Sequence, residues 1–189
     1  GTTTPLLSAI CNQSNWSTSN SRTYYDPGDN GPSSFTVSVS ISGNAGFRMM
    51  STPVASGTYT DLLSELWTQG MTGSDAAEAS GDNVWTWTVG SGGAGSWSVA
   101  TNLGSNMTAG AGILVYAFAD NDNDGTDDLP VTLSVSGTEN SGDVRYPAFG
   151  TIENTRFGFA GNPYYSTIDW DNVAKTNVCL LYTSPSPRD

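Results

Sequence analysis

The sequence predicts an all-β fold, an antiparallel β-sandwich or barrel-like domain with two short helical turns. Segments in which apolar and polar residues alternate recur at short intervals, as they do in sandwiches and barrels. Glycine occurs 22 times and separates many of these segments, which favours tight turns between strands. Helical patterns are too few and too short to alternate with the strands, so a parallel βαβ sheet is not expected.

The first half of the domain is expected to contain two strands and one helix. Phe35–Ile41 alternates strictly between apolar and hydroxyl side chains, which is the pattern of a strand with one buried face. After a glycine-containing turn, Phe47–Met50 restarts a strand that ends before Pro53. Asp61–Trp67 predicts a helix of about two turns, in which Asp61 caps the first turn.

The second half of the domain is expected to consist of strands. Val84–Val89 and Ser96–Val99 predict a hairpin around a glycine-rich loop. Ile113–Phe118 is the most apolar segment and predicts a central strand. Three further strands are expected, at Val131–Ser136, Val144–Phe149 and Thr155–Ala160.

Composition and repetition divide the chain into four parts. Residues 1–34 are rich in Ser, Asn, Thr and Pro and are expected to end an upstream region and form a linker, whereas residues 35–155 form the β-rich domain. Residues 156–178 repeat a pattern of residues 47–53, in which a Phe is followed by a Pro six positions later. They are expected to be the truncated start of a second repeat. Asp169 is expected to start the second helical turn. Residues 179–189 resemble a translated sequencing adapter, so we expect the biological sequence to stop near Val178.

Composition also excludes several classes of function. The sequence contains no histidine, which removes the Ser-His-Asp triad and imidazole metal ligands. The net charge of −12 argues against nucleic acid as a partner, because little positive charge is available to neutralise phosphates. No apolar run reaches the length of about 18 to 20 residues that a membrane helix needs. Cys179 belongs to the adapter-like tail and leaves Cys11 without a partner, so no native disulfide is expected.

Several motifs are similar to a recurring module of large bacterial surface proteins: Gly46–Val54, Leu66–Gly70, Ala109–Tyr116 and Ala160–Trp170. Over roughly residues 42–178 the chain resembles a β-rich module of Bacteroidetes-type secreted proteins, which usually lies upstream of a type IX secretion sorting domain. The most specific element is Gly-Asn-Pro-Tyr at residues 161–164, followed by Ser166 and by Ile-Asp-Trp at residues 168–170. The resemblance implies secretion, an extracellular or cell-surface location and a non-catalytic role, and it supplies no catalytic residues.

The acidic segment 120–128 matches the start of a calcium-binding loop. Aspartates stand at loop positions 1, 3, 5 and 9, and Gly125 stands at position 6, where such a loop turns sharply. The bidentate Glu of position 12 is replaced by Val131, so the pattern resembles thrombospondin type 3 loops better than an EF-hand. The alternative is a solvated turn whose carboxylates repel one another. The expected Ca²⁺ ligands are Asp120, Asp122, Asp124, Thr126 and Asp128.

Three tryptophans form a second candidate site. Trp85 and Trp87 project from one face of a strand, and Trp97 is expected across the hairpin from them. An exposed row of these rings would stack on sugars, as in carbohydrate-binding modules. Alternatively the rings face the interior of the sandwich, since aromatic side chains dominate core burial. Exposed rings would favour glycan binding, and buried rings would favour a structural role.

Catalysis is not expected. A glycosidase requires no histidine but requires two carboxylates that face each other, and the glutamates of this chain stand in no recognisable framework. Residues and resemblance together predict a non-catalytic structural or adhesion module of an extracellular bacterial protein. We expect it to be monomeric and to contact other domains of its own chain or surface glycans.

Overall fold

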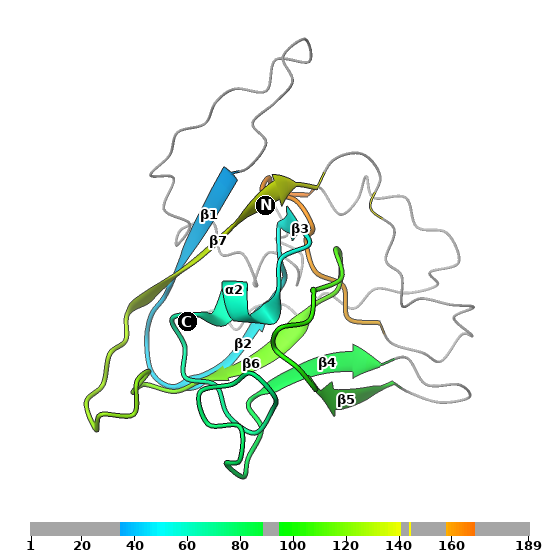
Figure 1. Ribbon diagram of the computed structural model, residues 1–189. Coiled ribbons are helices and arrows are strands. Elements are labelled where there is room, and N and C mark those ends of the chain that lie inside the picture. Colours follow the sequence, from blue (N-terminus) through cyan, green and yellow to red (C-terminus); the bar gives the residue numbers. More distant parts are fainter. Residues whose placement is uncertain (1–34, 89–94, 141–143, 145–157, 169–189) are drawn as a thin grey trace, which may run out of the picture.

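A computed structural model of the protein describes residues 35–88, 95–140, 144 and 158–168 (Figure 1). Over these residues the chain is all-β, with two antiparallel sheets in a sandwich-like arrangement and very little helix, so the predicted fold class is confirmed. The elements are β1 (Phe35–Ile41), β2 (Gly46–Met50), β3 (Val54–Ala55), α2 (Tyr59–Leu63), β4 (Val84–Thr88), β5 (Ser96–Val99), β6 (Ile113–Ala117) and β7 (Val131–Glu139).

Two sheets enclose one hydrophobic core. The three-stranded sheet has the order β1-β7-β3 and is drawn above the four-stranded sheet, whose order is β2-β6-β4-β5 (Figure 1). Val37 and Leu133 reach the core from the first sheet, and Val84 and Val115 reach it from the second; each is at most 2% exposed. Each buried side chain of this kind contributes about 1.5 to 3 kcal/mol, so the core holds the sheets together.

Alternation in the three-stranded sheet separates apolar from hydroxyl side chains. In β1 and β7, valine and leucine residues face the core and lie opposite one another across the two strands. On the outer face, the hydroxyl oxygens of Thr36 and Ser136 lie 2.6 Å apart, and those of Ser38 and Ser134 lie 2.8 Å apart. The predicted strands Phe35–Ile41 and Val131–Ser136 are therefore present, and the second extends to Glu139.

In the four-stranded sheet, β6 lies between β2 and β4, as its apolar sequence predicts. Its residues Ile113, Val115 and Ala117 are buried, at most 1% exposed, while the residues between them face the other side of the sheet. The predicted hairpin is also present, with β5 paired antiparallel to β4.

The helix begins and ends earlier than predicted. Thr58, not Asp61, is the N-cap: its hydroxyl accepts the Asp61 N–H at 3.0 Å, and the Asp61 carboxylate accepts the Thr58 N–H at 2.9 Å. This reciprocal capping box places Asp61 in the first turn of α2, which ends at Leu63. Leu62, Leu63 and Leu66 are nevertheless buried, as expected from their shared face.

Polar side chains organise the long connection from α2 to β4. Asn83, only 1% exposed, donates through Nδ2 to the carbonyls of Trp67 at 2.8 Å and Tyr116 at 3.1 Å. Its Oδ1 accepts the Gln69 N–H at 2.9 Å. Since a buried amide without such partners would cost free energy, these bonds fix the connection beside β6 just before β4 begins.

Residues 158–168 pack against the β-rich domain. The Gly161 N–H donates to the Gly110 carbonyl at 2.9 Å, and the Ser51 hydroxyl donates to the Asn162 carbonyl at 2.8 Å. Gly161 lies so close to Ser51 that a Cβ on it would be 2.2 Å from the Ser51 Cβ. Apart from Val144, the predicted strand Val144–Phe149 lies outside the described residues, as does most of Thr155–Ala160. The boundary at residues 155 and 156, the second helical turn, both cysteines, and residues 1–34 and 179–189 also lie outside them.

Candidate functional site

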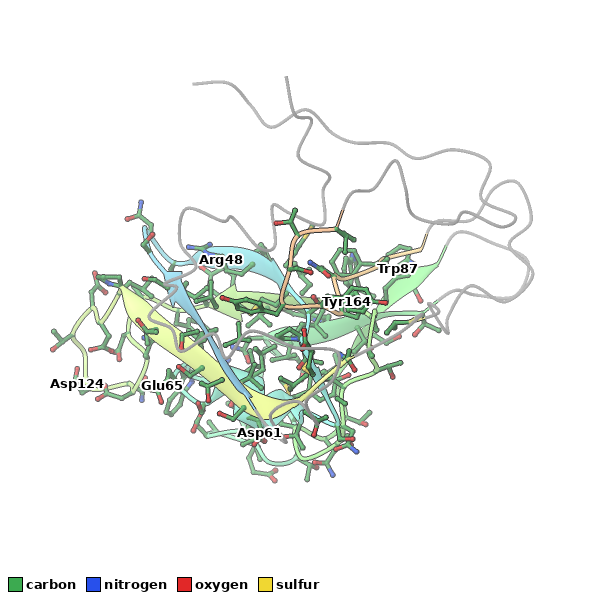
Figure 2. All side chains as sticks on the ribbon, turned by 90° about the horizontal axis from the view of Figure 1, so that it is seen from above. Arg48, Asp61, Glu65, Trp87, Asp124 and Tyr164 are labelled. Atoms are coloured by element: carbon green, nitrogen blue, oxygen red, sulfur yellow. The ribbon has the colours of Figure 1, made fainter. Side chains whose placement is uncertain are left out.

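The acidic loop connects β6 to β7 at one end of the sandwich. Figure 2 shows Asp124 and Trp87 at opposite ends of the described chain, and the two segments are likewise apart in Figure 1. The base of the loop is closed by Asp128, whose N–H donates to the Ala119 carbonyl at 2.8 Å. The Asp128 carboxylate also accepts the Asn121 N–H at 2.7 Å.

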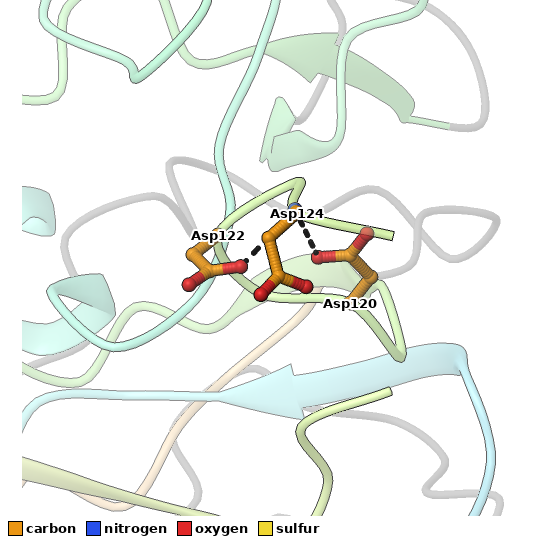
Figure 3. A group of neighbouring side chains, drawn as sticks. All are labelled: Asp120, Asp122 and Asp124. Atoms are coloured by element: carbon orange, nitrogen blue, oxygen red, sulfur yellow. Dashed lines mark hydrogen bonds between the residues drawn. The ribbon is translucent and has the colours of Figure 1, made fainter. Parts of the chain in front are cut away.

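Within the loop, carboxylates accept hydrogen bonds from nearby backbone N–H groups. The N–H of Asp124 lies 3.2 Å from one carboxylate oxygen of Asp120 and 3.2 Å from one of Asp122 (Figure 3). The Gly125 N–H donates to the other Asp120 oxygen at 2.8 Å. Asn123 and Gly125 adopt φ values of 61° and 93°, which let the chain curl around these oxygens.

The loop favours the ionised form of Asp120. Desolvation acts to raise the pKa of this carboxyl, but hydrogen bonds from the backbone of Gly125, Asn123, Asp124 and Asp122 outweigh it. The pKa of Asp120 therefore lies below its ordinary value, because N–H donors stabilise the carboxylate more than the acid.

Three of the five predicted metal ligands come together. One carboxylate oxygen each of Asp120, Asp122 and Asp124 lies within 4.8 Å of the others. Oxygens on one Ca²⁺ at 2.3 to 2.6 Å can be separated by at most about 5 Å, so this spacing fits a single calcium ion. Asp128 is not one of these three carboxylates, and its carboxylate accepts the Asn121 N–H at the base of the loop. The Thr126 N–H donates to Asp124 at 2.8 Å, and the backbone carbonyl of Thr126 stays a predicted ligand, as does Asp128.

The second candidate site is the outer face of the four-stranded sheet, which we call the aromatic face. Directly opposed residues of antiparallel strands share a face of the sheet. The pairs Phe47–Tyr116, Trp85–Leu114 and Trp87–Trp97 therefore place aromatic and other apolar side chains together on this face. The aromatic face consists of Phe47, Met49, Trp85, Trp87, Trp97, Val99, Leu114 and Tyr116.

The tryptophans do not face the interior of the sandwich, so that interpretation is wrong. The inward position of β4 belongs to Val84, which is fully buried, whereas Trp85 and Trp87 lie on the opposite side and remain partly exposed. Trp97 is 39% exposed and Phe47 is 60% exposed. The sheet thus places its largest rings outward and its smaller aliphatic residues inward.

The rings of the aromatic face pack edge to face. The centroids of Trp87 and Trp97 are 5.1 Å apart with planes at 75°, and those of Phe47 and Tyr116 are 5.1 Å apart at 80°. Phe159, from the packed segment 158–168, contacts Trp97 in the same way at 5.2 Å. Such pairs add about 0.5 to 1.5 kcal/mol beyond area burial, so contacts between the rings help to hold this face together.

Sequence reasoning missed the contribution of Phe47, Tyr116 and Phe159 to this surface. Phe47 and Tyr116 occupy alternate positions whose neighbours point to the core, and that alternation could have identified both of them. The contact of Phe159 with Trp97 joins residues distant in sequence, so no local sequence pattern predicts it.

Comparisons with protein-family models, with curated proteins and with solved structures found no match to this chain. In the part of the chain that the structure describes, no helix has the length and hydropathy needed to cross a membrane.

Proposed function

We propose that the chain is a non-catalytic structural or adhesion module of an extracellular, secreted or surface-anchored bacterial protein. In this proposal the aromatic face contacts other domains of the same chain, and Ca²⁺ stabilises the acidic loop. The observation that carries the proposal is the aromatic face itself, an uncharged surface that spans all four strands of one sheet and is partly exposed. Contiguous exposed apolar surfaces of this kind mark interaction sites.

Location and calcium have separate support. The extracellular location rests on the resemblance to Bacteroidetes-type surface modules, and the excess of 18 Asp and Glu over 6 Lys and Arg is compatible with it. Calcium rests on the spacing of Asp120, Asp122 and Asp124 and on the oxygen-only donor set, which a hard cation prefers.

Contact between the aromatic face and other domains is tested by expressing the chain together with adjacent domains. The intact gene is expressed with the next domain on each side, and acrylamide quenching of tryptophan fluorescence is compared with that of the present chain. Less quenching in the longer protein is expected, because a docked domain would cover Trp97 and its neighbours. Equal quenching would mean that adjacent domains do not use this face.

Calcium is tested through thermal unfolding in EDTA and in 10 mM CaCl₂ at matched ionic strength. A site of extracellular type binds with a dissociation constant of about 0.1 to 1 mM, so 10 mM Ca²⁺ stabilises the fold by about 1.4 to 2.7 kcal/mol. Asp122→Asn with Asp124→Asn should abolish this increase. The control, Asp127→Asn with Glu65→Gln, removes the same charge from exposed acids outside the triad and should retain it.

Glycan binding is the second candidate, favoured by the exposure of Trp97 and Phe47 on one face. Edge-to-face packing leaves fewer rings lying flat, so a sugar would stack on single rings and not on a broad platform. The strong negative charge favours neutral polysaccharides over acidic ones.

Tryptophan fluorescence is the readout for this second candidate. Titration with neutral polysaccharides should shift the emission of the wild-type chain and of Trp67→Phe, which changes a ring outside the aromatic face. Trp97→Ala should remove the shift. No response across a broad panel of polysaccharides would reject glycan binding and leave domain docking.

A further inference from the structure

Edges of β-sheets attract other strands unless they are protected, and most edges of this fold are protected. β3 has only two residues and β5 only four. At β2, the guanidinium of Arg48 donates to the carbonyls of Ser42 at 3.1 Å and Asn44 at 2.9 Å, which places a cation beside that edge. Short strands and charged side chains are the usual means of preventing edge-to-edge pairing.

Within the part of the chain that the structure describes, the edge of β1 has none of these protections. The strand has seven residues, Phe-Thr-Val-Ser-Val-Ser-Ile, without a charge, a proline or a glycine. It pairs with β7 on one side, and no other strand of the described residues pairs with its second side. Every second residue of β1 therefore presents its backbone N–H and C=O outward, and these groups need partners.

The side chains of β1 show which strand would fit. Across β1 and β7, hydroxyl side chains lie opposite hydroxyl side chains, as in Ser38 with Ser134, and apolar side chains lie opposite apolar ones, as in Val37 with Val135. Val37 is buried by this pairing, but Val39 is only partly buried. A further strand with the same alternation would cover Val39 and continue both faces.

A second β1 has this alternation in the required order. When two copies run antiparallel with Ser38 at the centre, Ser38 lies opposite Ser38 of the partner subunit. Val37 then lies opposite the partner's Val39, and Thr36 lies opposite the partner's Ser40. Each pair repeats the matching seen between β1 and β7. The arrangement is self-complementary, as a closed two-fold dimer requires.

Charge does not oppose this arrangement at short range. β1 is uncharged, and the acidic loop precedes Val131, which pairs with Ile41 at one end of the strand. The two-fold axis through Ser38 separates the two Ile41 residues by six residue rises, about 20 Å. That distance exceeds twice the Debye length of about 8 Å at physiological salt, so the two acidic loops are largely screened from each other.

We propose that the outer edge of β1, which pairs with no strand of the described residues, is a dimerisation site, at which two copies of this chain join their three-stranded sheets into one continuous antiparallel sheet. The proposal replaces the monomer expected from the sequence and is independent of the calcium and glycan proposals. Its partner is a second copy and not an unrelated strand, because the register about Ser38 is self-complementary on both faces.

The first test is sedimentation equilibrium of the full chain over a concentration series in 150 mM NaCl. The wild-type mass should rise from 19.8 kDa toward twice that value and no further. Ser38→Lys places two cations opposite each other at the axis and should weaken dimerisation at least about tenfold. Ser134→Lys removes the same hydroxyl pair and adds the same charge one strand away from the edge, so its dimerisation should match that of the wild type.

The second test fixes the register and does not depend on the folding of the lysine variant. With Cys11 and Cys179 replaced by serine, Ser38→Cys should form an intermolecular disulfide rapidly on mild oxidation, because the two residues face each other at the axis. Ser134→Cys should not. A wild-type chain that stays monomeric at all concentrations, or equal cross-linking of both cysteine variants, would overturn the proposal.

Discussion

At the scale of single residues, one threonine and one aspartate define the start of α2. Hydrogen bonds from the side chain and the backbone of Thr58 hold the pKa of the Asp61 carboxyl below its ordinary value, against a smaller opposing effect of desolvation. The helix has only five residues, too few to persist by propensity alone. The cap and the buried Leu62 and Leu63 must therefore hold it in place.

Removal of the cap should destabilise the fold measurably. Thr58→Ala leaves the Asp61 N–H without its acceptor and should lower the free energy of unfolding by about 1 kcal/mol in urea titrations. It should also raise the pKa of Asp61 toward its ordinary value, as read by NMR titration. Thr60→Ala, an exposed threonine of the same helix, is the control and should change the stability little. Equal effects of the two variants would contradict the capping role.

The same pair predicts a pH dependence. Because the pKa of Asp61 is lower in the folded chain, its charge stabilises the fold above the unfolded pKa of about 3.9, and this contribution is lost as the pH falls through the folded value. Wild type should therefore be more stable than Asp61→Asn at pH 7, and the difference should shrink in acid below about pH 4. Urea unfolding at a series of pH values measures it, and a difference independent of pH would refute the linkage.

Gly161 of segment 158–168 packs closely against Ser51 of the domain. Gly161→Ala would place a Cβ 2.2 Å from the Cβ of Ser51, and overpacking of this kind costs about 1 to 3 kcal/mol. Gly104→Ala is the control, since the nearest atom is a side-chain oxygen of Asn102 at 3.2 Å. Chemical denaturation of both variants tests the contact, and an unchanged stability of Gly161→Ala would mean that the segment does not pack at Ser51.

At the scale of elements, the alternation of apolar and polar residues predicted where the strands lie. It did not predict which side of each strand faces the core. In β4, apolar Val84 alternates with Trp85 and Trp87, while Thr86 shares the side of Val84. Hydrophobicity alone favours the tryptophans inside, yet the sheet turns Val84 inward because β6 places Val115 opposite it. That pairing is a long-range contact, so no window of sequence contains it.

Other differences between the predicted and the observed structure also arise from contacts between residues distant in sequence. β3 has only two residues, which is too short for a periodic signal, and it exists because it pairs with the end of β7. In the acidic loop, spacing along the chain correctly grouped Asp120, Asp122 and Asp124. Asp128 fits the same spacing, but its backbone bond to Ala119 ties it to the base of the loop. Local patterns therefore predicted the elements, and contacts between distant segments determined their ends and faces.

The β4-β5 hairpin offers a prediction at this scale. A double-mutant cycle of Trp87→Leu and Trp97→Leu should give a coupling energy of about 0.5 to 1.5 kcal/mol, because the rings meet edge to face. A control cycle of Phe47→Leu and Trp97→Leu joins the two edge strands, which three strand spacings of about 4.8 Å separate, and should give a coupling near zero. Equal couplings in the two cycles would show that the ring pair adds nothing specific.

At the scale of the whole molecule, the two outer faces of the sandwich have opposite character. The three-stranded sheet presents hydroxyl pairs such as Thr36 with Ser136, whereas the four-stranded sheet presents the aromatic face. The proposed dimer extends the hydroxyl sheet at β1 and leaves the aromatic face available for a different partner. One module would then join a copy of itself and a neighbouring domain at the same time, which is compatible with the structural role proposed above.

Charge is the remaining property of the whole molecule, and it predicts a response to salt. The chain has 18 Asp and Glu against 6 Lys and Arg, and Arg48 is the one cation in the part that the structure describes. Repulsion among these carboxylates opposes the compact state, and salt screens it because the Debye length falls from about 30 Å at 0.01 M to about 3 Å at 1 M.

The urea midpoint of unfolding should therefore rise as NaCl increases from 10 to 500 mM, with EDTA present and protein concentration held constant. Screening acts on all the carboxylates, so Asp122→Asn with Asp124→Asn should become more stable in low salt and respond less to added NaCl. CaCl₂ at matched ionic strength should add its further increase only to chains that keep the three loop aspartates. A midpoint that is flat in NaCl would mean that self-repulsion does not limit the stability of this acidic chain.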